Sequence, residues 1–333
     1  MDQEIYPDNQ NEPDAMPAGG SEPPPPAPHE EQDVMPGAKP SAVGRLKSQK
    51  WLLFALIGCL GGVAGSAFAE LAPGDSANPS FIETAMKTGI WFAMAASFLA
   101  VGLFMANEIY LRHNLHPRFV QRGLFTGAVG GMIAGFIAQA LFSKMMTGEM
   151  SNTKIYAIYS ICWGVLGALL GVGLAGRVPN LGVIRGIGAG AVGGAIGGTA
   201  FVFFGDYFVA DDASQATQNI MGVVGRMAGI GLLGAALGLA MVVVESLFNE
   251  ATLEVVWAPN ETTKFNLGAD PIYIGGGPED QIYVRGFGER HASVLFSNGI
   301  IEFIDGESQN RTPLKNGSHL QIGTVKLIIH AAK

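Results

Sequence analysis

One arginine stands inside a long apolar stretch, where it could do chemistry. Arg226 lies near the start of the segment 219–247, and an unpaired charge within a membrane costs a few kcal/mol or more. It could be a substrate or gating charge with a carboxylate partner among Glu70, Asp206, Asp211 and Asp212. Alternatively, its guanidinium reaches the membrane interface and the apolar span begins at about Met227. Both interpretations stay open on the sequence alone.

Other residue types with chemical potential have plainer explanations. His113 and His116 could share one helical face as metal ligands, but no nearby cysteine or carboxylate pair completes a metal site. Cys59 and Cys162 both fall within apolar segments, so we expect small packing residues and no disulfide. Gly186, Gly188 and Gly190 look like a dinucleotide loop, but no strand precedes them. We therefore expect no catalytic site, no metal and no cofactor, and predict that the protein is not an enzyme.

Six apolar segments are the elements that must position these residues. Each is close to the ~20 residues that a helix needs to cross the hydrocarbon core of a bilayer. The predicted transmembrane helices cover about 51–70, 88–106, 123–142, 155–176, 183–204 and 219–247, within a membrane domain at 45–248. Polar groups in them, such as Ser97, Ser160 and Thr199, can bond to their own helix backbone and outline no pathway.

The cationic residues of the connecting loops predict which way the helices run. Lys and Arg in short loops are retained on the cytoplasmic side. With the N-terminus in the cytoplasm, nine such residues fall inside and three outside, the outer ones being Lys87, Lys144 and Lys154. An even number of spans then returns the chain to the cytoplasm. We expect a multi-pass protein of a bacterial cytoplasmic membrane with both termini inside.

The first 44 residues have the composition of a disordered tail. Residues 1–38 contain nine acidic side chains, no Lys or Arg and many prolines. This stretch alone accounts for the net charge of -8, so the acidity of the whole chain implies nothing about nucleic acid, and we expect no nucleic-acid partner. Without apolar periodicity the tail is predicted to be disordered, with local polyproline II.

The apolar segments also repeat. RGLFTGAVGGMIAG at 122–135 and RGIGAGAVGGAIGG at 185–198 are identical at nine of fourteen positions. The helices that follow agree as well, because GVLGALLG at 164–171 matches GLLGAALG at 231–238 at six of eight positions. A fainter match joins GGVAGSAF at 61–68 to GAIGGTAF at 194–201. The pattern predicts hairpins of one ancestral type, with the first two helices as a diverged third copy.

Small residues recur every four positions within the repeats. Such rows allow helix backbones to approach closely in lipid, where apolar side chains give no other driving force for association. The predicted packing residues are Gly123, Gly127, Gly131, Gly135, Gly186, Gly190, Gly194 and Gly198. They could pack helices of one chain together or join chains in a homo-oligomer, and the sequence does not divide them between these uses.

After the last apolar segment the pattern changes to short strands. Runs at 252–257, 272–274, 281–284, 292–296, 300–304 and 324–329 alternate in the manner of β-structure, and Asn298-Gly299 between two of them is a strong hairpin signal. About eighty residues of this kind predict a small β-sandwich at 251–333, whose loops would carry binding.

This region resembles the forkhead-associated (FHA) family, β-sandwiches that recognise phosphothreonine peptides through loops at one end. The resemblance covers about a quarter of the chain. It rests on Ile274-Gly275-Gly276, on Gly288 to Ala292 (GERHA), on Asp305 with Ser308 to Thr312 (SQNRT), on Asn316-Gly317 and on a late Leu320-x-x-Gly323. It implies structural roles for Gly275, His291, Asn316 and Gly317, and a peptide-backbone contact for Asn310.

Two residues on which the family depends for phosphate are different in this chain. Gly276 stands where the family has an arginine, and Gly288 stands where it has a serine. Glu289 adds a negative charge that would repel phosphate. Arg285, Arg290 and Arg311 could form a substitute anion site, although surface charges are the simpler interpretation. The sequence thus predicts an FHA-like sandwich that no longer depends on phosphothreonine.

Two functions from different classes remain. The favoured one is a non-enzymatic membrane scaffold or signalling adaptor, whose FHA-like domain docks an unidentified cytoplasmic protein, phosphorylated or not. The alternative is a small transporter or channel with an FHA-like regulatory domain, for which Arg226 is the chief support.

Overall fold

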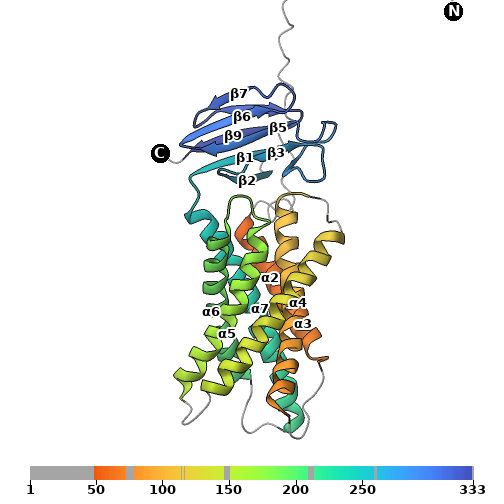
Figure 1. Ribbon diagram of the computed structural model, residues 1–333. Coiled ribbons are helices and arrows are strands. Elements are labelled where there is room, and N and C mark those ends of the chain that lie inside the picture. The colour runs from red at the N-terminus through yellow and green to blue at the C-terminus, as the bar shows by residue number, and fades with distance from the viewer. Residues whose placement is uncertain are drawn as a thin grey trace, which may run out of the picture. The chain divides into compact units, whose positions relative to one another are not determined.

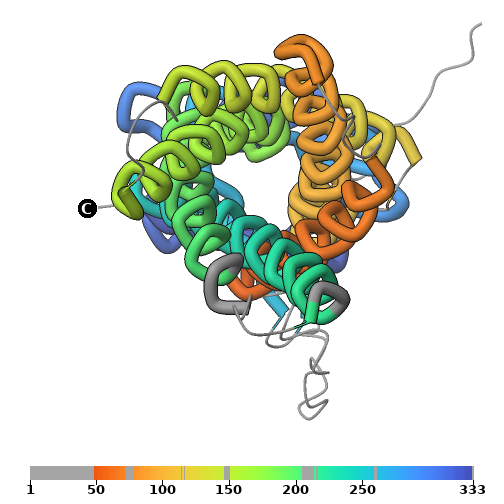
Figure 2. Tube along the Cα trace, turned by 90° about the horizontal axis from the view of Figure 1, so that it is seen from below, coloured from red at the N-terminus to blue at the C-terminus, as the bar shows by residue number. Residues whose placement is uncertain are grey.

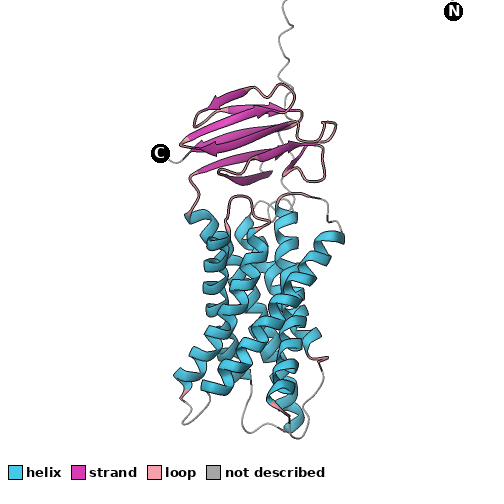
Figure 3. Ribbon diagram, viewed as in Figure 1, coloured by secondary structure: helices cyan, strands magenta, loops and turns pink. Residues whose placement is uncertain are grey.

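A computed structural model describes residues 49–72, 79–113, 115, 117–145, 151–208, 214–258 and 261–331. The acidic, proline-rich tail that the sequence predicts at 1–44 lies outside the described residues. Within the described part, every helix precedes residue 248 and every strand follows it (Figures 1 and 3).

Six described helices are long and apolar enough to cross a membrane. Their bounds are α2 Lys50–Ala69, α3 Phe81–Tyr110, α4 Pro117–Met145, α5 Asn152–Ala175, α6 Val183–Phe208 and α7 Gln215–Leu247. The coarse expectation of a multi-pass membrane protein is therefore met by length and composition. Several helices exceed the predicted apolar spans because serines cap them further out. The Ser80 hydroxyl accepts the Glu83 N–H at the start of α3, and Ser214 does the same for Thr217 at the start of α7.

The six helices pack as a ring in chain order. Each packs against the helix before and the helix after it, and α7 closes the ring against α2. Figure 2 shows this order along the helix axes. The α4 to α5 seam has the loosest packing of these neighbouring pairs.

A short glycine motif sets three seams of the ring. Gly-x-x-Gly-Gly occurs at 58–62 in α2, 127–131 in α4 and 190–194 in α6. The outer two glycines of each motif face the preceding helix of the ring, where an added Cβ would strike a backbone carbonyl oxygen. The pairs are Gly58 with Gly234, Gly62 with Ile230, Gly127 with Ala96, Gly131 with Phe92, Gly190 with Gly167, and Gly194 with Trp163.

The middle glycine of each motif faces the following helix. An added Cβ on Gly61 would lie 2.9 Å from the Phe98 carbonyl oxygen, and one on Gly193 would lie 2.9 Å from the Leu237 Cα. In α4 the equivalent Gly130 has its nearest neighbour, the Leu169 Cβ, at 3.5 Å. The three copies thus make equivalent contacts, with the loosest approach at the α4 to α5 seam.

These contacts correct the register of the third copy. The sequence match aligned Gly61 with Gly194, but Gly61 faces the following helix whereas Gly194 faces the preceding one. The structural counterpart of Gly61 is Gly193, one residue earlier. The error arose because the two glycines are adjacent, so that a short match in composition cannot tell which helix face each one occupies.

All eight predicted packing glycines face helices of the same chain. Gly123, Gly127, Gly131 and Gly135 approach α3, while Gly186, Gly190, Gly194 and Gly198 approach α5. Intrachain packing is therefore a use that the structure assigns to these two rows.

The interior of the ring is filled by apolar side chains at equivalent positions of the three copies. Phe92 and Trp163 stack with ring centroids 4.7 Å apart, and Ile230 takes the same position in the third copy. Further sets in the same buried cluster are Leu99, Leu170 and Leu237, then Leu103, Leu174 and Met241. The gap between the tubes in Figure 2 is therefore no sign of a channel, because buried side chains occupy the helix-facing surfaces.

The C-terminal region consists of two sheets. One has the order β2-β1-β9-β8 and the other β4-β3-β5-β6-β7. The strands are β1 Ala251–Ala258, β2 Glu261–Leu267, β3 Ile272–Gly275, β4 Ile282–Tyr283, β5 Ala292–Ser297, β6 Ile300–Asp305, β7 Arg311–Leu314, β8 His319–Ile322 and β9 Val325–Ala331. Every second residue of β1 points into the core, so Leu253 and Val255 are buried with Ile274 and Val294 of the other sheet.

The predicted hairpin is present. Asn298 and Gly299 have φ of 54° and 78°, and Ser297 pairs with Ile300 across the turn from β5 to β6. The sequence missed β2, β7 and β8. Their polar residues, as in ETTKFNL of β2, hide strands that have only one buried face or lie at a sheet edge.

Two glycines of α6 provide a matched test of the ring. An alanine at Gly190 would strike the Gly167 carbonyl oxygen, whereas one at Gly188 would meet nothing within 4 Å. We expect Gly190→Ala to destabilise the protein by roughly 1–3 kcal/mol through overpacking. Gly188→Ala should leave stability unchanged or raise it by up to about 1 kcal/mol. Unfolding of the purified chain in detergent micelles measures both, and equal effects would contradict this account of the seam.

Candidate functional site

Three loops come together at one end of the β region. They are the β3 to β4 loop (276–281), the β4 to β5 loop (284–291) and the β6 to β7 loop (306–310). The Gly276 N–H donates to the Gly288 carbonyl at 2.9 Å, and the Gly306 N–H donates to the His291 carbonyl at 2.8 Å. We call this set of loops the loop end.

A buried carboxylate holds two of these loops together. Asp280 is 2% exposed, and its Oδ2 accepts the N–H groups of Gly277 at 2.7 Å and Arg290 at 3.1 Å. Gly275 must lack a side chain here, because a Cβ would lie 2.5 Å from the same Oδ2. Sequence reasoning selected Gly275 but missed Asp280. The available signal was that Asp280 closely follows the sequence Gly-Gly-Gly-Pro, which is typical of a tight turn. An aspartate in such a turn is commonly hydrogen-bonded to nearby backbone N–H groups.

The predicted binding residues divide into two kinds. Arg285 and Asn310 are exposed on separate loops of the loop end. Arg290 is also exposed, has a φ of 50°, and holds its guanidinium 4.7 Å from the Tyr273 ring centroid. Arg311 is different, because its Nη1 lies 3.1 Å from the Glu302 carboxylate across β6 and β7. The structure thus brings the loops of Arg290 and Asn310 together and assigns Arg311 to an ion pair.

The predicted structural residues make local contacts. The His291 ring lies against Phe287, with centroids 4.6 Å apart. Asn316 accepts the Ala331 N–H at 3.3 Å, and Gly317 has a φ of 81°, which favours glycine. Hydrogen bonds from the Ser308 backbone N–H and hydroxyl to Asp305 lower the pKa of that carboxyl below its usual value and fix the β6 to β7 turn.

A second polar surface lies where the loop after α3 contacts the β region. The Tyr110 hydroxyl accepts the Lys264 backbone N–H at 2.9 Å. Arg112 bonds to Glu261 at 2.7 Å and lies over the Trp257 ring. In the loop after α5, Asn180 donates to the Asn266 carbonyl at 2.9 Å and accepts the Asp270 N–H at 3.2 Å. Both connections of the helical ring therefore hold β2. The first also contacts β1 through Trp257, and the second also holds the turn after β2.

His113 acts as a clamp between α3 and β4. Its Nδ1 lies 2.8 Å from the Glu108 carboxylate, and its Nε2 lies 3.0 Å from the Gln281 carbonyl oxygen. A carbonyl only accepts, so both ring nitrogens donate when the imidazole is protonated. Burial by itself lowers the pKa of His113, but the Glu108 hydrogen bond and charge outweigh it and raise the pKa above its usual value. His116, the other histidine that the sequence singled out, lies outside the described residues.

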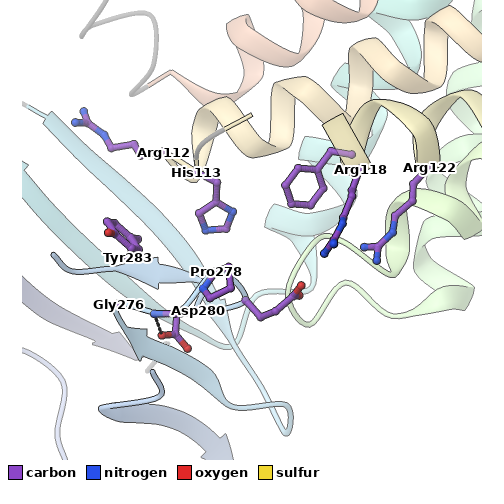
Figure 4. Close-up of a pocket in the computed structure, with 11 residues that line it drawn as sticks. Arg112, His113, Arg118, Arg122, Gly276, Pro278, Asp280 and Tyr283 are labelled. Atoms are coloured by element: carbon purple, nitrogen blue, oxygen red, sulfur yellow. Dashed lines mark hydrogen bonds between the residues drawn. The ribbon is translucent and has the colours of Figure 1, made fainter. Parts of the chain in front are cut away.

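A cavity of about 560 Å³ lies beside this clamp. It is bordered by the loop after α3, the first turns of α4 and the β3 to β4 loop (Figure 4). Arg118 and Arg122 extend side by side from α4 toward the β3 to β4 loop, while Arg112 points away from them.

Arg226 pairs with Glu70. Its Nε and Nη2 donate to the two carboxylate oxygens at 2.7 and 2.8 Å, and 39% of the Arg226 side chain is exposed. Of the partners considered from sequence, Asp211 and Asp212 lie outside the described residues. The pair joins the residue that follows α2 to a point in α7 eleven residues after Gln215. By the glycine alignment, the equivalent position between α3 and α4 holds a Thr88 to Gln139 hydrogen bond of 3.1 Å.

The three hydroxyls singled out from the sequence bond to their own helices, as expected. Ser97 donates to Ala93 O at 2.7 Å, and Ser160 donates to Tyr156 O at 2.8 Å. Thr199 donates to Ala195 O at 3.0 Å. Among the described residues, the Ser66 Oγ and the Trp163 Nε1 are buried in the helices without a hydrogen-bond partner.

No family model matches this chain, and no match was found among curated proteins or solved structures. The FHA resemblance accordingly rests on the residues quoted above. Among the residues that the structure describes, no group of three or more His, Cys, Asp or Glu could hold a metal ion.

The His113 clamp predicts a pH dependence with a definite sign. Because its pKa is raised on folding, the stabilisation is fully present below the unfolded value of about 6.5 and is lost as pH rises through the folded value. We expect hydrogen exchange of residues 276–283 to become faster as pH rises from about 6 to about 9, after correction for intrinsic exchange.

His113→Ala should abolish that extra pH dependence, whereas His319→Ala, at an exposed position of β8, should retain it. The neighbouring groups Glu108, Arg112 and Asp280 are unchanged in both variants. A pH profile identical in all three proteins would refute the clamp.

Proposed function

We propose that this protein is a non-enzymatic membrane scaffold or signalling adaptor that docks a cytoplasmic partner protein through the loop end of an FHA-like domain. The observation that carries the proposal is the loop end itself, where hydrogen bonds hold three loops in one surface with exposed Arg285, Arg290 and Asn310. Loops fixed by a rigid scaffold are common carriers of binding.

The apolar ring supports an anchoring role for the helices. In the spans, the buried polar residues are Ser66, Ser97, Asn107, Glu108 and Glu245. The last three lie near the ends of α3 and α7, and Glu245 is paired there with Lys50. A polar solute needs groups at depth to replace its hydration, and the described residues offer no such series.

The packing at Gly276 supports recognition without phosphothreonine. A Cβ there would strike the Phe287 carbonyl oxygen, so the arginine typical of the family has no room in this backbone. An added Cβ on Gly288 would meet no atom within 4 Å. The backbone therefore has room for the serine that the family has at this position, but this chain does not carry it. We infer that the partner is read by its peptide backbone and shape.

The same proposal places both termini in the cytoplasm, in line with the loop charges. The N-terminal end of α2 and the C-terminal end of α7 lie at one end of the ring, because Lys50 bonds to Glu245.

Docking can be tested with the full chain in detergent micelles as bait for solubilised native lysate. We expect the double variant Arg285→Ala with Asn310→Ala to capture roughly tenfold less partner, since truncating central contacts of an interface costs about 1–2 kcal/mol or more. The matched control Lys326→Ala, on an exposed position of β9, should capture as much as the wild type. Treating the lysate with phosphatase should change nothing, and loss of capture after that treatment would overturn the phosphate-independent proposal.

The second candidate is a transporter or channel, and the Arg226 to Glu70 pair is the observation that favours it. The partial exposure of both side chains and the bidentate contact between two neighbouring helices fit a structural tie better. In proteoliposomes we expect the wild-type protein to give ion and solute flux no greater than in empty vesicles. We expect the same result for the variants Arg226→Ala and Glu70→Gln. Robust flux that disappears in Arg226→Ala would favour transport over the scaffold.

A further inference from the structure

The cavity beside the His113 clamp gathers cations from two connections of the helical ring. Arg118 and Arg122 come from the first turns of α4 and border the cavity. Arg177 comes from the loop after α5, and its guanidinium lies 5.2 Å from the ring centroid of Phe119, which also borders the cavity. Glycines face them across the cavity, since Gly276 and Gly277 of the β3 to β4 loop have no side chains to fill it (Figure 4).

Most other charges around the cavity are already matched. Arg112 is paired with Glu261, and His113 with Glu108. The Asp280 carboxylate accepts the backbone N–H groups of Gly277 in its own loop and of Arg290 in the β4 to β5 loop. On the walls, Arg122 has no ion-pair partner among the described residues, and the charge of Arg177 lies close enough to interact with it. Glu279 borders the cavity, and the carboxylates of Glu279 and Glu108 both act on Arg177.

Two of these cations are close enough to repel each other. Burial lowers the pKa of Arg177, and the positive charge of Arg122 lowers it further. Arg122 forms no hydrogen bond or ion pair with any residue that the structure describes. Placing two guanidinium groups close together costs free energy, because their positive charges repel each other. An anion held between them would offset that cost.

The size and position of the cavity narrow the class of anion. About 560 Å³ lies within the ~300–1,000 Å³ typical of ligand sites. Guanidinium groups bind phosphoryl oxygens bidentately, and several cations suit a group with more than one charged oxygen. The helical wall of the cavity lies just after α3 ends and where α4 begins, which is the depth of lipid head groups for helices that span a membrane.

We propose that this cavity binds a phosphate-bearing anion through Arg122 and Arg177, with Arg118 on the same wall. The phosphate belongs either to an anionic lipid head group or to a soluble phosphate compound, and the shared chemistry is recognition of phosphoryl oxygens by guanidinium groups. The cavity shares the β3 to β4 loop with the loop end, but Arg122 and Arg177 lie outside the loop end, so experiments on these two arginines can fail without the docking proposal failing.

Arginine labelling of the full chain tests the site. The protein is purified in dodecyl maltoside, which carries no phosphate, and treated with phenylglyoxal, and each arginine is followed by mass spectrometry. Inorganic phosphate is added in one arm, phosphatidylglycerol in a second and phosphate-free diacylglycerol in a third. Arg285, exposed on the β4 to β5 loop, serves as the internal reference.

We expect labelling of Arg122 and Arg177, relative to Arg285, to fall roughly tenfold when the ligand exceeds its dissociation constant about tenfold. Protection by phosphatidylglycerol alone identifies a lipid head group, and protection by inorganic phosphate identifies a soluble ligand. Diacylglycerol should not protect. Equal labelling in all arms, or equal protection by diacylglycerol, overturns the proposal.

A variant separates binding from a change in accessibility. Arg122→Gln removes one cation, and we expect it to abolish ligand protection of Arg177, while Lys326→Gln, at an exposed position of β9, keeps it. Both positions are exposed, so neither change should disturb folding. Protection of Arg177 that persists in Arg122→Gln would show that the two arginines do not share a ligand.

Discussion

Backbone-to-backbone contact between helices is the constraint on which this structure depends. Lipid is as apolar as leucine, so helices in a membrane gain little by burying apolar side chains and must gain by close packing. In this chain the outer glycines of each Gly-x-x-Gly-Gly motif lie against carbonyl groups of the preceding helix. A Cβ at any of these points would force the seam apart, and the ring is built three times from the same contact.

The repeat also determines what the ring presents to the β region. The ends of α3, α5 and α7 are equivalent in the three copies, and all three are used. Tyr110 and His113 follow the first, Asn180 follows the second, and the third continues directly into β1. Polar contacts are concentrated at this end, whereas the interior stacks apolar residues such as Phe92 and Trp163. Polar and charged groups that could bind a ligand are therefore concentrated at this end of the helices and in the β region, where the loop end and the basic cavity lie.

The β region shows how close packing of its loops limits which side chains they can carry. Asp280 ties two loops together through backbone N–H groups, and this tight arrangement leaves no room for a side chain at Gly275 or Gly276. Cations near these loops come instead from α4 and the loop after α5. The positive charge beside the β3 to β4 loop thus belongs to side chains of the helical region.

The sequence by itself determined the features that depend on local pattern. Apolar length predicted six helices, the four-residue glycine rows predicted close packing, and Asn298-Gly299 predicted a hairpin, because each signal is contained in a few neighbouring residues. Only the tertiary structure decided which helix each glycine faces, that Arg226 pairs with Glu70, and that Asp280 is buried. It alone brought Arg122 beside Arg177. These facts join residues far apart in the chain, and the energy of such a contact depends on geometry that no single segment contains.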